Sequence, residues 1–180
     1  MKRTIKNAQL RDTVTFIQTS ESSGGDVTEL EVVVMPGGIN PAHFHKKYDE
    51  TVHVLEGILL LTLSKRAKIT LLQGDQYVIK AGQVHSLQNA ADVKLKLRSI
   101  IIPANQGFES ALRIMYGLAN DGLYNAHKMP RNFVHLSVCS VMSDTRLPGL
   151  KSLLNPVFIL LAHCARWTGI TERLISKYCV

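Results

Sequence analysis

Histidines and carboxylates gather in one short stretch of this sequence. Residues 36–57 read PGGINPAHFHKKYDETVHVLEG, and they hold the following side chains that could bind a metal ion: His43, His45, Asp49, Glu50, His53 and Glu56. Imidazole nitrogens and carboxylate oxygens together form a donor set that suits Fe(II), Mn, Ni, Cu or Zn. The alternative is a surface hairpin with polar residues and no ligand. Which of the two alternatives holds depends on the strands and turns that carry these residues.

The spacing of these residues is that of β-strands. His43 and His45 are two residues apart, so on a strand both imidazoles lie on one face, with Phe44 on the other. A turn in the polar segment 46–49 would bring Glu50 back beside the pair. The next strand then alternates, which places His53 on the face opposite Glu50 and outside any shared site.

A further histidine, His85, follows two glycines in the later segment 74–89, GDQYVIKAGQVHSLQN. Side chains in a closed barrel alternate between the interior and the exterior. Neighbouring strands can therefore direct His43, His45, Glu50 and His85 to one interior point. Four protein ligands on an octahedral metal would leave two positions for substrate, water or O₂.

Residues 1–104 read as short strands separated by turns, with no helical period between them. The predicted strands are 13–19, 27–35, 51–57, 58–64, 68–82 and 93–103. This spacing favours an antiparallel sandwich or barrel. The last strand alternates strictly, with Val93, Leu95 and Leu97 on one face and basic residues on the other, as expected for a strand with one face in water.

The pattern changes to a helical one near residue 107. Phe108, Leu112, Met115 and Leu118 have helical spacing. A second helix is predicted to start at Pro130, and Pro156 is expected to break or kink a third, more apolar one. We therefore divide the chain into a β-barrel domain, residues 1–107, and a C-terminal α-helical extension, residues 108–180.

Composition narrows the possible environments and partners. The chain has 180 residues, 46% of them hydrophobic, which suits one domain with a core and an appendage. Three cysteines without metal spacing indicate free thiols in a reducing compartment. The basic N-terminal segment is not followed by an apolar run, so we expect no secretory signal and a cytoplasmic location.

The formal net charge of +7 does not by itself indicate nucleic acid. The basic residues are dispersed, and the densest sets are Lys65, Arg66 and Lys68, and Lys94, Lys96 and Arg98. Neither set is interleaved with aromatic residues as in single-strand binders. We expect a small-molecule ligand or substrate and no nucleic-acid partner.

Two segments resemble the paired signatures of the cupin superfamily. Residues 37–57 match G, five residues, H-x-H, four residues, E, six residues, G. Residues 74–89 match G, five residues, P-x-G, two residues, H, three residues, N, except that Lys80 stands in place of proline. The resemblance covers roughly residues 28–104. This position lies in a turn, so the replacement of proline by Lys80 affects how the chain enters the next strand more than it affects metal binding.

This resemblance implies a mostly β fold, an antiparallel jelly-roll-like β-barrel that holds a metal near its mouth. The implied ligands are His43, His45, Glu50 and His85, and the metal is a divalent transition metal: Fe, Mn, Ni, Cu or Zn. The implied function is a metal-dependent enzyme acting on a small organic molecule, such as a dioxygenase or an isomerase. The alternative is a non-catalytic cupin that binds or senses a small ligand. No separate catalytic residue is identified.

Other polar side chains have ordinary interpretations. Tyr48 and Tyr77 fit a barrel core or rim, and Arg98 fits a solvated face better than a carboxylate clamp. Gln83 is a weaker candidate for the mouth of the site. The histidines of the extension have no partner pattern, and we interpret them as structural or exposed: His127, His135 and His163.

The extension is apolar enough to need a partner surface. The run Pro156–Ala162 is far shorter than the ~20 residues of a membrane span. Packing on the barrel or on a second subunit is preferred, and we expect a homodimer. The alternative is an interfacial helix with Arg166 and Trp167 at the headgroups of a membrane.

Overall fold

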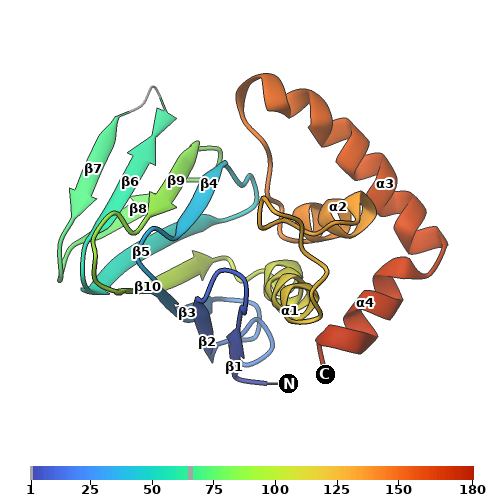
Figure 1. Cartoon of the computed structure of the whole chain (residues 1–180), viewed down its shortest axis with the longest axis horizontal. Helices are drawn as coiled ribbons and strands as arrows, with labels where there is room; N and C mark the ends of the chain where they lie inside the picture. Colours follow the sequence, from blue (N-terminus) through green and yellow to red (C-terminus); the bar gives the residue numbers. More distant parts are fainter. Residues whose placement is uncertain (1, 65–66) are drawn as a thin grey trace.

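The computed structural model describes residues 2–64 and 67–180, so Lys65 and Arg66 of the first basic set lie outside the described residues. Strands occupy the N-terminal part of the chain and helices the C-terminal part (Figure 1). The strands are β1 (Thr4–Lys6), β2 (Thr13–Gln18), β3 (Thr28–Val34), β4 (Ile39–His43), β5 (Asp49–Glu56), β6 (Leu59–Leu63), β7 (Lys68–Leu71), β8 (Gln76–Ile79), β9 (His85–Gln88) and β10 (Leu95–Ile102). The helices are α1 (Gln106–Asn120), α2 (Phe133–Met142), the 3-10 helix η2 (Gly149–Leu154), α3 (Asn155–Trp167) and α4 (Ile170–Tyr178).

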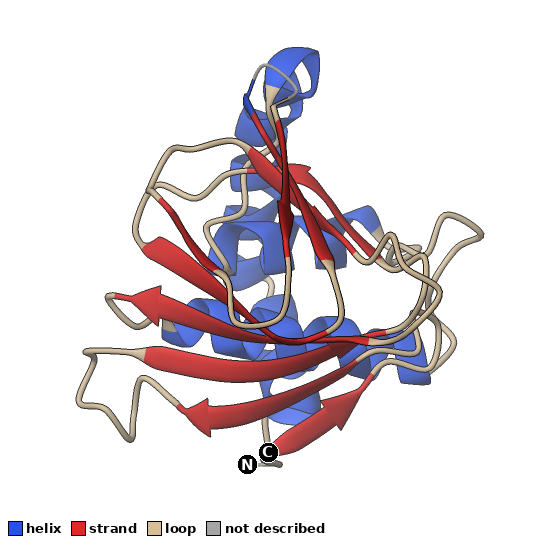
Figure 2. Cartoon of the chain, turned by 90° about the vertical axis from the view of Figure 1, so that its left-hand side faces the viewer, coloured by secondary structure: helices blue, strands red, loops and turns tan. Residues whose placement is uncertain are grey.

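The strands form two antiparallel sheets. One has six strands in the order β1-β2-β3-β10-β5-β8, and the other has four in the order β4-β9-β6-β7. The two sheets lie in separate layers of strands (Figure 2). The antiparallel, jelly-roll-like β fold predicted from the sequence is confirmed, although the two sheets do not close into one hydrogen-bonded barrel within the described ranges.

An apolar core lies within the β part. It consists of the following buried residues: Val52, Val54, Leu59, Leu61, Leu71, Ile79, Leu95 and Leu97. The alternation predicted for β5 is present, since Glu50, Val52 and Val54 are buried while Thr51 and His53 are not. In contrast, Val93 is 59% exposed because β10 begins only at Leu95, so the predicted apolar face starts two residues late.

Helix α1 attaches the extension to the six-stranded sheet. Its side chain Tyr116 joins a buried cluster with Val14, Phe16 and Leu30 from β2 and β3. The buried carboxylate of Glu109 also accepts hydrogen bonds from the Thr28 hydroxyl and from a backbone N–H of the preceding loop. The extension therefore shares a core with the sheet.

Two predictions about the helices are wrong in detail. Helix α2 starts at Phe133, not at Pro130, because the side chain of Asn132 accepts hydrogen bonds from the first turn and caps it. Pro156 does not kink a helix, because it lies in the first turn of α3, which follows η2 directly. The sharp bend of 81° comes later, between α3 and α4, where Gly169 has a φ of +71°.

Among the described residues, no single helix is long and apolar enough to cross a membrane. One bent pair, Gly149–Trp167 with Ile170–Tyr178, meets the requirement on length and composition only.

Candidate metal centre

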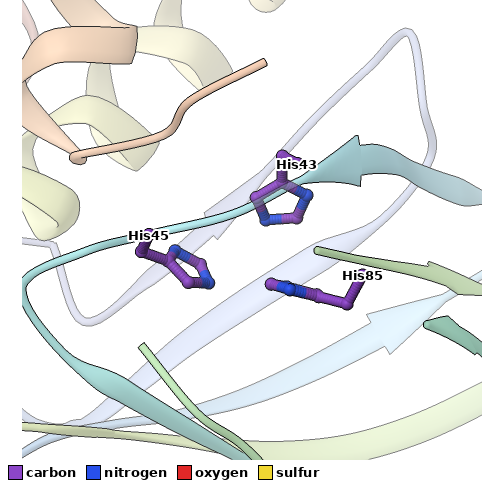
Figure 3. Close-up of side chains that lie close together, drawn as sticks. All are labelled: His43, His45 and His85. Carbon is purple, nitrogen blue, oxygen red and sulfur yellow. The ribbon is translucent and has the colours of Figure 1, made fainter. Parts of the chain in front are cut away.

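Three histidines converge at one end of the space between the two sheets (Figure 3). His43 ends β4 and His85 begins β9, and these two residues are paired across the four-stranded sheet. His45 lies in the segment that leads from β4 to β5 and so crosses to the other sheet. One ring nitrogen from each of the three lies within 4.8 Å of the others, and all three residues are buried. The predicted convergence of His43, His45 and His85 is present.

Two of the imidazoles are oriented by backbone carbonyls. The Nδ1 of His43 lies 2.7 Å from the Pro41 carbonyl oxygen, and the Nδ1 of His85 lies 2.9 Å from that of Gln83. A ring N–H that donates to a carbonyl leaves the Nε2 lone pair of the same ring free. Both rings are therefore held in the tautomer that presents Nε2 as a ligand.

The free nitrogens are buried without hydrogen-bond partners. They are Nε2 of His85 and both ring nitrogens of His45. Leaving a polar atom buried and unpaired costs about 1–3 kcal/mol, so such atoms need an explanation. A bound metal ion provides one for a single nitrogen on each ring, because it would accept the lone pair of that nitrogen. This donor set therefore fits a divalent metal.

Glu50 reaches the cluster from β5 in the six-stranded sheet. Its Oε2 lies 3.3 Å from Nε2 of His45 and 3.6 Å from Nε2 of His85. Its Oε1 accepts a hydrogen bond of 2.8 Å from the Ser99 hydroxyl on β10. One carboxylate oxygen is thus held by the sheet while the other faces the histidines.

The electrostatics of the cluster keep His43 and His45 neutral and the Glu50 carboxylate charged. Burial, together with the neighbouring His85, lowers the pKa of His43 from 6.5 to about 4. Burial also lowers the pKa of His45 to about 4, against the opposing effect of Glu50. Burial alone would raise the pKa of Glu50, but contacts with His85, His45 and Ser99 outweigh it and lower the pKa to about 2. These are the protonation states that metal ligation requires.

The loop that carries His45 is held by the C-terminal extension. The carboxylate oxygen Oδ2 of Asp144 accepts hydrogen bonds from the backbone N–H groups of Lys46 (2.7 Å) and Lys47 (2.9 Å). Asp144 is buried and has a positive φ of +54°, which Asp tolerates better than most residues. It closes the turn directly after His45.

Two further contacts join the same segments. Phe44, between the two histidines, forms an isolated antiparallel bridge with Arg146. The Tyr48 hydroxyl donates to the Ser143 carbonyl oxygen (2.9 Å), while its ring lies 4.3 Å from that of His45, centroid to centroid. Residues 143–146 of the extension thus support residues 44–48 of the site on three sides.

The remaining polar candidates take structural places. Arg98 pairs with Glu29, Nε to Oε1, at 3.1 Å on the outer face of the sheet. The Gln83 side chain donates to the Tyr77 hydroxyl, while its backbone carbonyl orients His85. Lys80 pairs with Asp49 at 2.8 Å, so the residue that replaces the proline of the signature is used to join two strands.

The other histidines lie elsewhere in the described part of the chain. His53 is on the opposite face of β5, and the histidines of the extension are not in the cluster: His127, His135 and His163. Two surface cavities, of about 240 and 310 Å³, are lined by helical residues and do not include the clustered histidines.

Sequence reasoning missed the residues that support the ligands. Ser99 had a detectable signal, since it is a polar residue that continues the buried face of Leu95 and Leu97. Asn89, by contrast, was part of the second signature; it is buried, and its amide donates to the carbonyls of Val34 and Val93 and so joins strand ends without contacting the cluster. Asp144 had no such signal, because it is about one hundred residues away from the loop it holds.

The fold and the cluster define a class of protein: a double-sheet, jelly-roll-like β protein with three inward-facing histidines positioned for a metal ion. The family model of the cupin domain matches residues 30–103. Residues 30–103, in the β part of this chain, are therefore a cupin domain. The matched range agrees with the 28–104 expected from the two signatures.

Curated relatives are germin-like proteins of plants. The chain is 34% identical to germin-like protein subfamily 2 member 1 of Arabidopsis thaliana over 86 residues, which cover 46% of this chain and 39% of that protein. It is 40% identical to germin-like protein 1-1 of Oryza sativa subsp. japonica over 67 residues, 35% of this chain and 31% of that protein. The chain thus spans about two fifths or less of the length of these relatives.

Two solved structures of bacterial proteins resemble part of this chain. A predicted oxalate decarboxylase from Thermotoga maritima has a TM-score of 0.49 at 18% identity, over 51% of this chain and 80% of that one. KdgF from Halomonas sp. has a TM-score of 0.47 at 17% identity, over 53% and 81% of the two chains.

Proposed function

We propose that this cupin binds a divalent transition metal through His43, His45, His85 and Glu50, and that it is a metal-dependent enzyme acting on a small organic molecule. The observation that carries the metal site is the set of buried imidazole nitrogens without hydrogen-bond partners, which face one another and one ionised carboxylate. Three neutral nitrogens and one negative oxygen form a mixed donor set that Fe(II), Mn, Ni, Cu and Zn all accept.

A metal held in this way would supply Lewis-acid chemistry and, if it is Fe or Mn, one-electron chemistry with O₂. The residues of the chain orient and insulate that site. Ser99 fixes one oxygen of Glu50, the Pro41 and Gln83 carbonyls fix two imidazoles, and the adjacent apolar core excludes water. We further propose an oxygenase-like reaction as the activity of this site.

Metal content tests the first part of the proposal. Protein purified without chelator is expected to hold close to one equivalent of a transition metal by elemental analysis. His45→Ala and His85→Ala each remove one of the proposed ligands and should abolish stoichiometric metal. His127→Ala is the matched control, because it removes an exposed imidazole outside the cluster. Equal metal content in all four proteins would contradict the proposed ligand set.

Oxygen consumption tests the proposed reaction. The metal-loaded protein is incubated with diketones, phenols and thiols in an oxygen electrode, beside the His85→Ala variant. Metal-dependent O₂ uptake with at least one substrate class is the expected result. No uptake across the three classes would contradict the oxygenase assignment and leave the metal site standing.

One observation favours a second candidate function, a cupin that binds a ligand or a metal without catalysis. His43, His45 and His85 are only 6%, 2% and 0% exposed, so access to the site is narrow. An O₂-inert protein whose melting temperature rises with a small ligand would support this alternative.

A further inference from the structure

One helical face of the extension is apolar, continuous and uncovered. It consists of the following residues of η2 and α3, which we call the α3 seam: Leu150, Leu153, Val157, Leu160, Cys164 and Trp167. Leu150, Leu153 and Trp167 are 90%, 76% and 86% exposed, and Leu160 is 63% exposed. Such exposure of large apolar side chains along one line marks an interaction surface.

The opposite face of α3 is already used. Phe158 and Ala165 are its buried residues, and Phe158 packs edge to face on Phe133 of α2, with ring centroids 5.0 Å apart. Figure 1 shows α3 at the edge of the molecule, with α2 on its inner side. The seam therefore faces away from the rest of the chain.

The spacing of the seam identifies the shape that fits it. Its residues follow one another at intervals of three, four, three, four and three, which is the a/d pattern of two helices packed along their length. Six residues at this spacing form a stripe onto which another helix can pack along its length.

Charge distinguishes a second copy from other partners. The positions that border such a seam hold no Lys, Arg, Asp or Glu: Gly149, Leu154, Pro156, Leu161, His163 and Thr168. Lys151 and Arg166 belong to neither set of positions. A helix with uncharged borders can pair with its own copy without like-charge repulsion, whereas binding to an anionic membrane draws on basic residues beside the apolar face.

The seam exposes large apolar side chains that a partner can cover. Five of its six residues are 42% to 90% exposed, and covering them would supply a large part of the roughly 800 Å² that each partner buries in a stable interface. We propose that the α3 seam pairs with the α3 seam of a second copy of this chain, which makes the protein a homodimer through its helical extension. This proposal does not depend on the metal site.

The mass of the protein in solution tests the proposal. The full chain is expected to be a dimer by light scattering during size-exclusion chromatography. Leu153→Glu with Leu160→Glu places two charges in the seam and should weaken the dimer by roughly a hundredfold or more. The same charges at Leu72 and Val93, which are 53% and 59% exposed on the β part, are the matched control and should leave the dimer intact. Circular dichroism checks that each variant folds.

Cysteine cross-linking tests whether the two α3 seams touch and shows whether they run parallel or antiparallel. Cys164 is a seam residue and is exposed, whereas Cys139 is buried. With diamide as oxidant, a parallel pair would join Cys164 to its own copy, and an antiparallel pair would join it to a cysteine introduced by Leu153→Cys. One of the two disulfides is expected, and Cys164→Ser should remove it.

Three results would overturn the proposal. They are a monomer over the micromolar range, a dimer that the seam variant leaves unchanged, and the absence of both disulfides. Binding of the monomer to vesicles of anionic phospholipid, lost in the Leu153→Glu and Leu160→Glu variant, would assign the seam to a membrane surface instead.

Discussion

Two histidines of the cluster, His43 and His45, are buried in the neutral state, which lowers the stability of the fold under acid conditions. His43 and His45 titrate near pH 4 in the folded chain and near pH 6.5 when unfolded, so the unfolded chain binds more protons between these values. Stability is therefore fully present above pH 6.5 and is lost as the pH falls toward 4. We expect the free energy of unfolding of the metal-free protein to fall by a few kcal/mol across this window.

Urea unfolding of the metal-free protein at pH 7.5, 5.5 and 4.5 measures this loss. His43→Gln cannot titrate and should show a shallower dependence on pH, whereas His127→Gln, at an exposed position, should match the unchanged chain. Identical slopes for His43→Gln and the unchanged chain would show that burial does not depress the pKa of His43.

Ser99 fixes the orientation of the Glu50 carboxylate, the proposed fourth ligand. Ser99→Ala removes the 2.8 Å hydrogen bond to Oε1 of Glu50 and leaves that oxygen without its partner. Because such supporting contacts tune ligand orientation, metal affinity should fall by roughly tenfold to a hundredfold. Competition with a chromogenic chelator measures the change. Ser86→Ala on β9 is the control. If it lowered metal affinity as much as Ser99→Ala does, Ser99 would have no specific role in orienting Glu50.

The clustering of the three histidines with Glu50 could be predicted from the sequence because each residue lies at a fixed spacing within a short motif. Their supporting groups could not, because a carbonyl such as that of Pro41 carries no side-chain signal. Ser99 is intermediate, since the alternation of β10 places it on the buried face but does not say what it contacts.

At the scale of elements, the turn after His45 depends on Asp144 of the extension. Asp144→Ala deprives the N–H groups of Lys46 and Lys47 of their acceptor and puts a residue without a polar side chain at positive φ. We expect metal affinity to fall by about tenfold and stability by about 1–3 kcal/mol. Asp144→Asn tolerates the backbone conformation and keeps one acceptor. Its metal affinity and stability should therefore lie between those of Asp144→Ala and those of the unchanged chain.

Asp121→Ala is the matched control for this prediction. Asp121 is a carboxylate of the extension that bonds Lys177 and Tyr178 instead of the loop. If Asp144→Ala and Asp121→Ala lost stability equally and both kept full metal affinity, Asp144 would be a structural residue without influence on the site.

Elements with local signals were predictable, and elements set by distant contacts were not. The spacing of Phe108, Leu112, Met115 and Leu118 gave α1 correctly, and the alternation gave β5 and β10. The β4 strand ends at His43, whereas the sequence placed His45 on the same strand, because the backbone of Phe44 pairs with Arg146 rather than with a neighbouring strand. The sequence also led us to divide the chain into two domains at residue 107. That division stays a prediction.

At the scale of the whole molecule, the two parts are joined at two places far apart in the sequence. The α1 contacts with β2 and β3 form one core, and residues 143–146 hold the His45 loop at another. A structure joined in this way should unfold as a unit, since neither part can open without exposing apolar surface or unpaired N–H groups of the other.

Thermal unfolding followed by two probes checks this last expectation. The far-ultraviolet signal at 222 nm reports mainly on the helices. The near-ultraviolet tyrosine signal, recorded in a variant whose other tyrosines (Tyr77, Tyr124 and Tyr178) are replaced by Phe, reports on Tyr48 and Tyr116, which are buried. The two transitions should coincide, and metal at about 100 times its Kd should stabilise the folded state by about 2.7 kcal/mol and move both upward together by several degrees. A helical transition that stays fixed while the tyrosine transition rises would show that the extension is an independent appendage, as the division at residue 107 predicts.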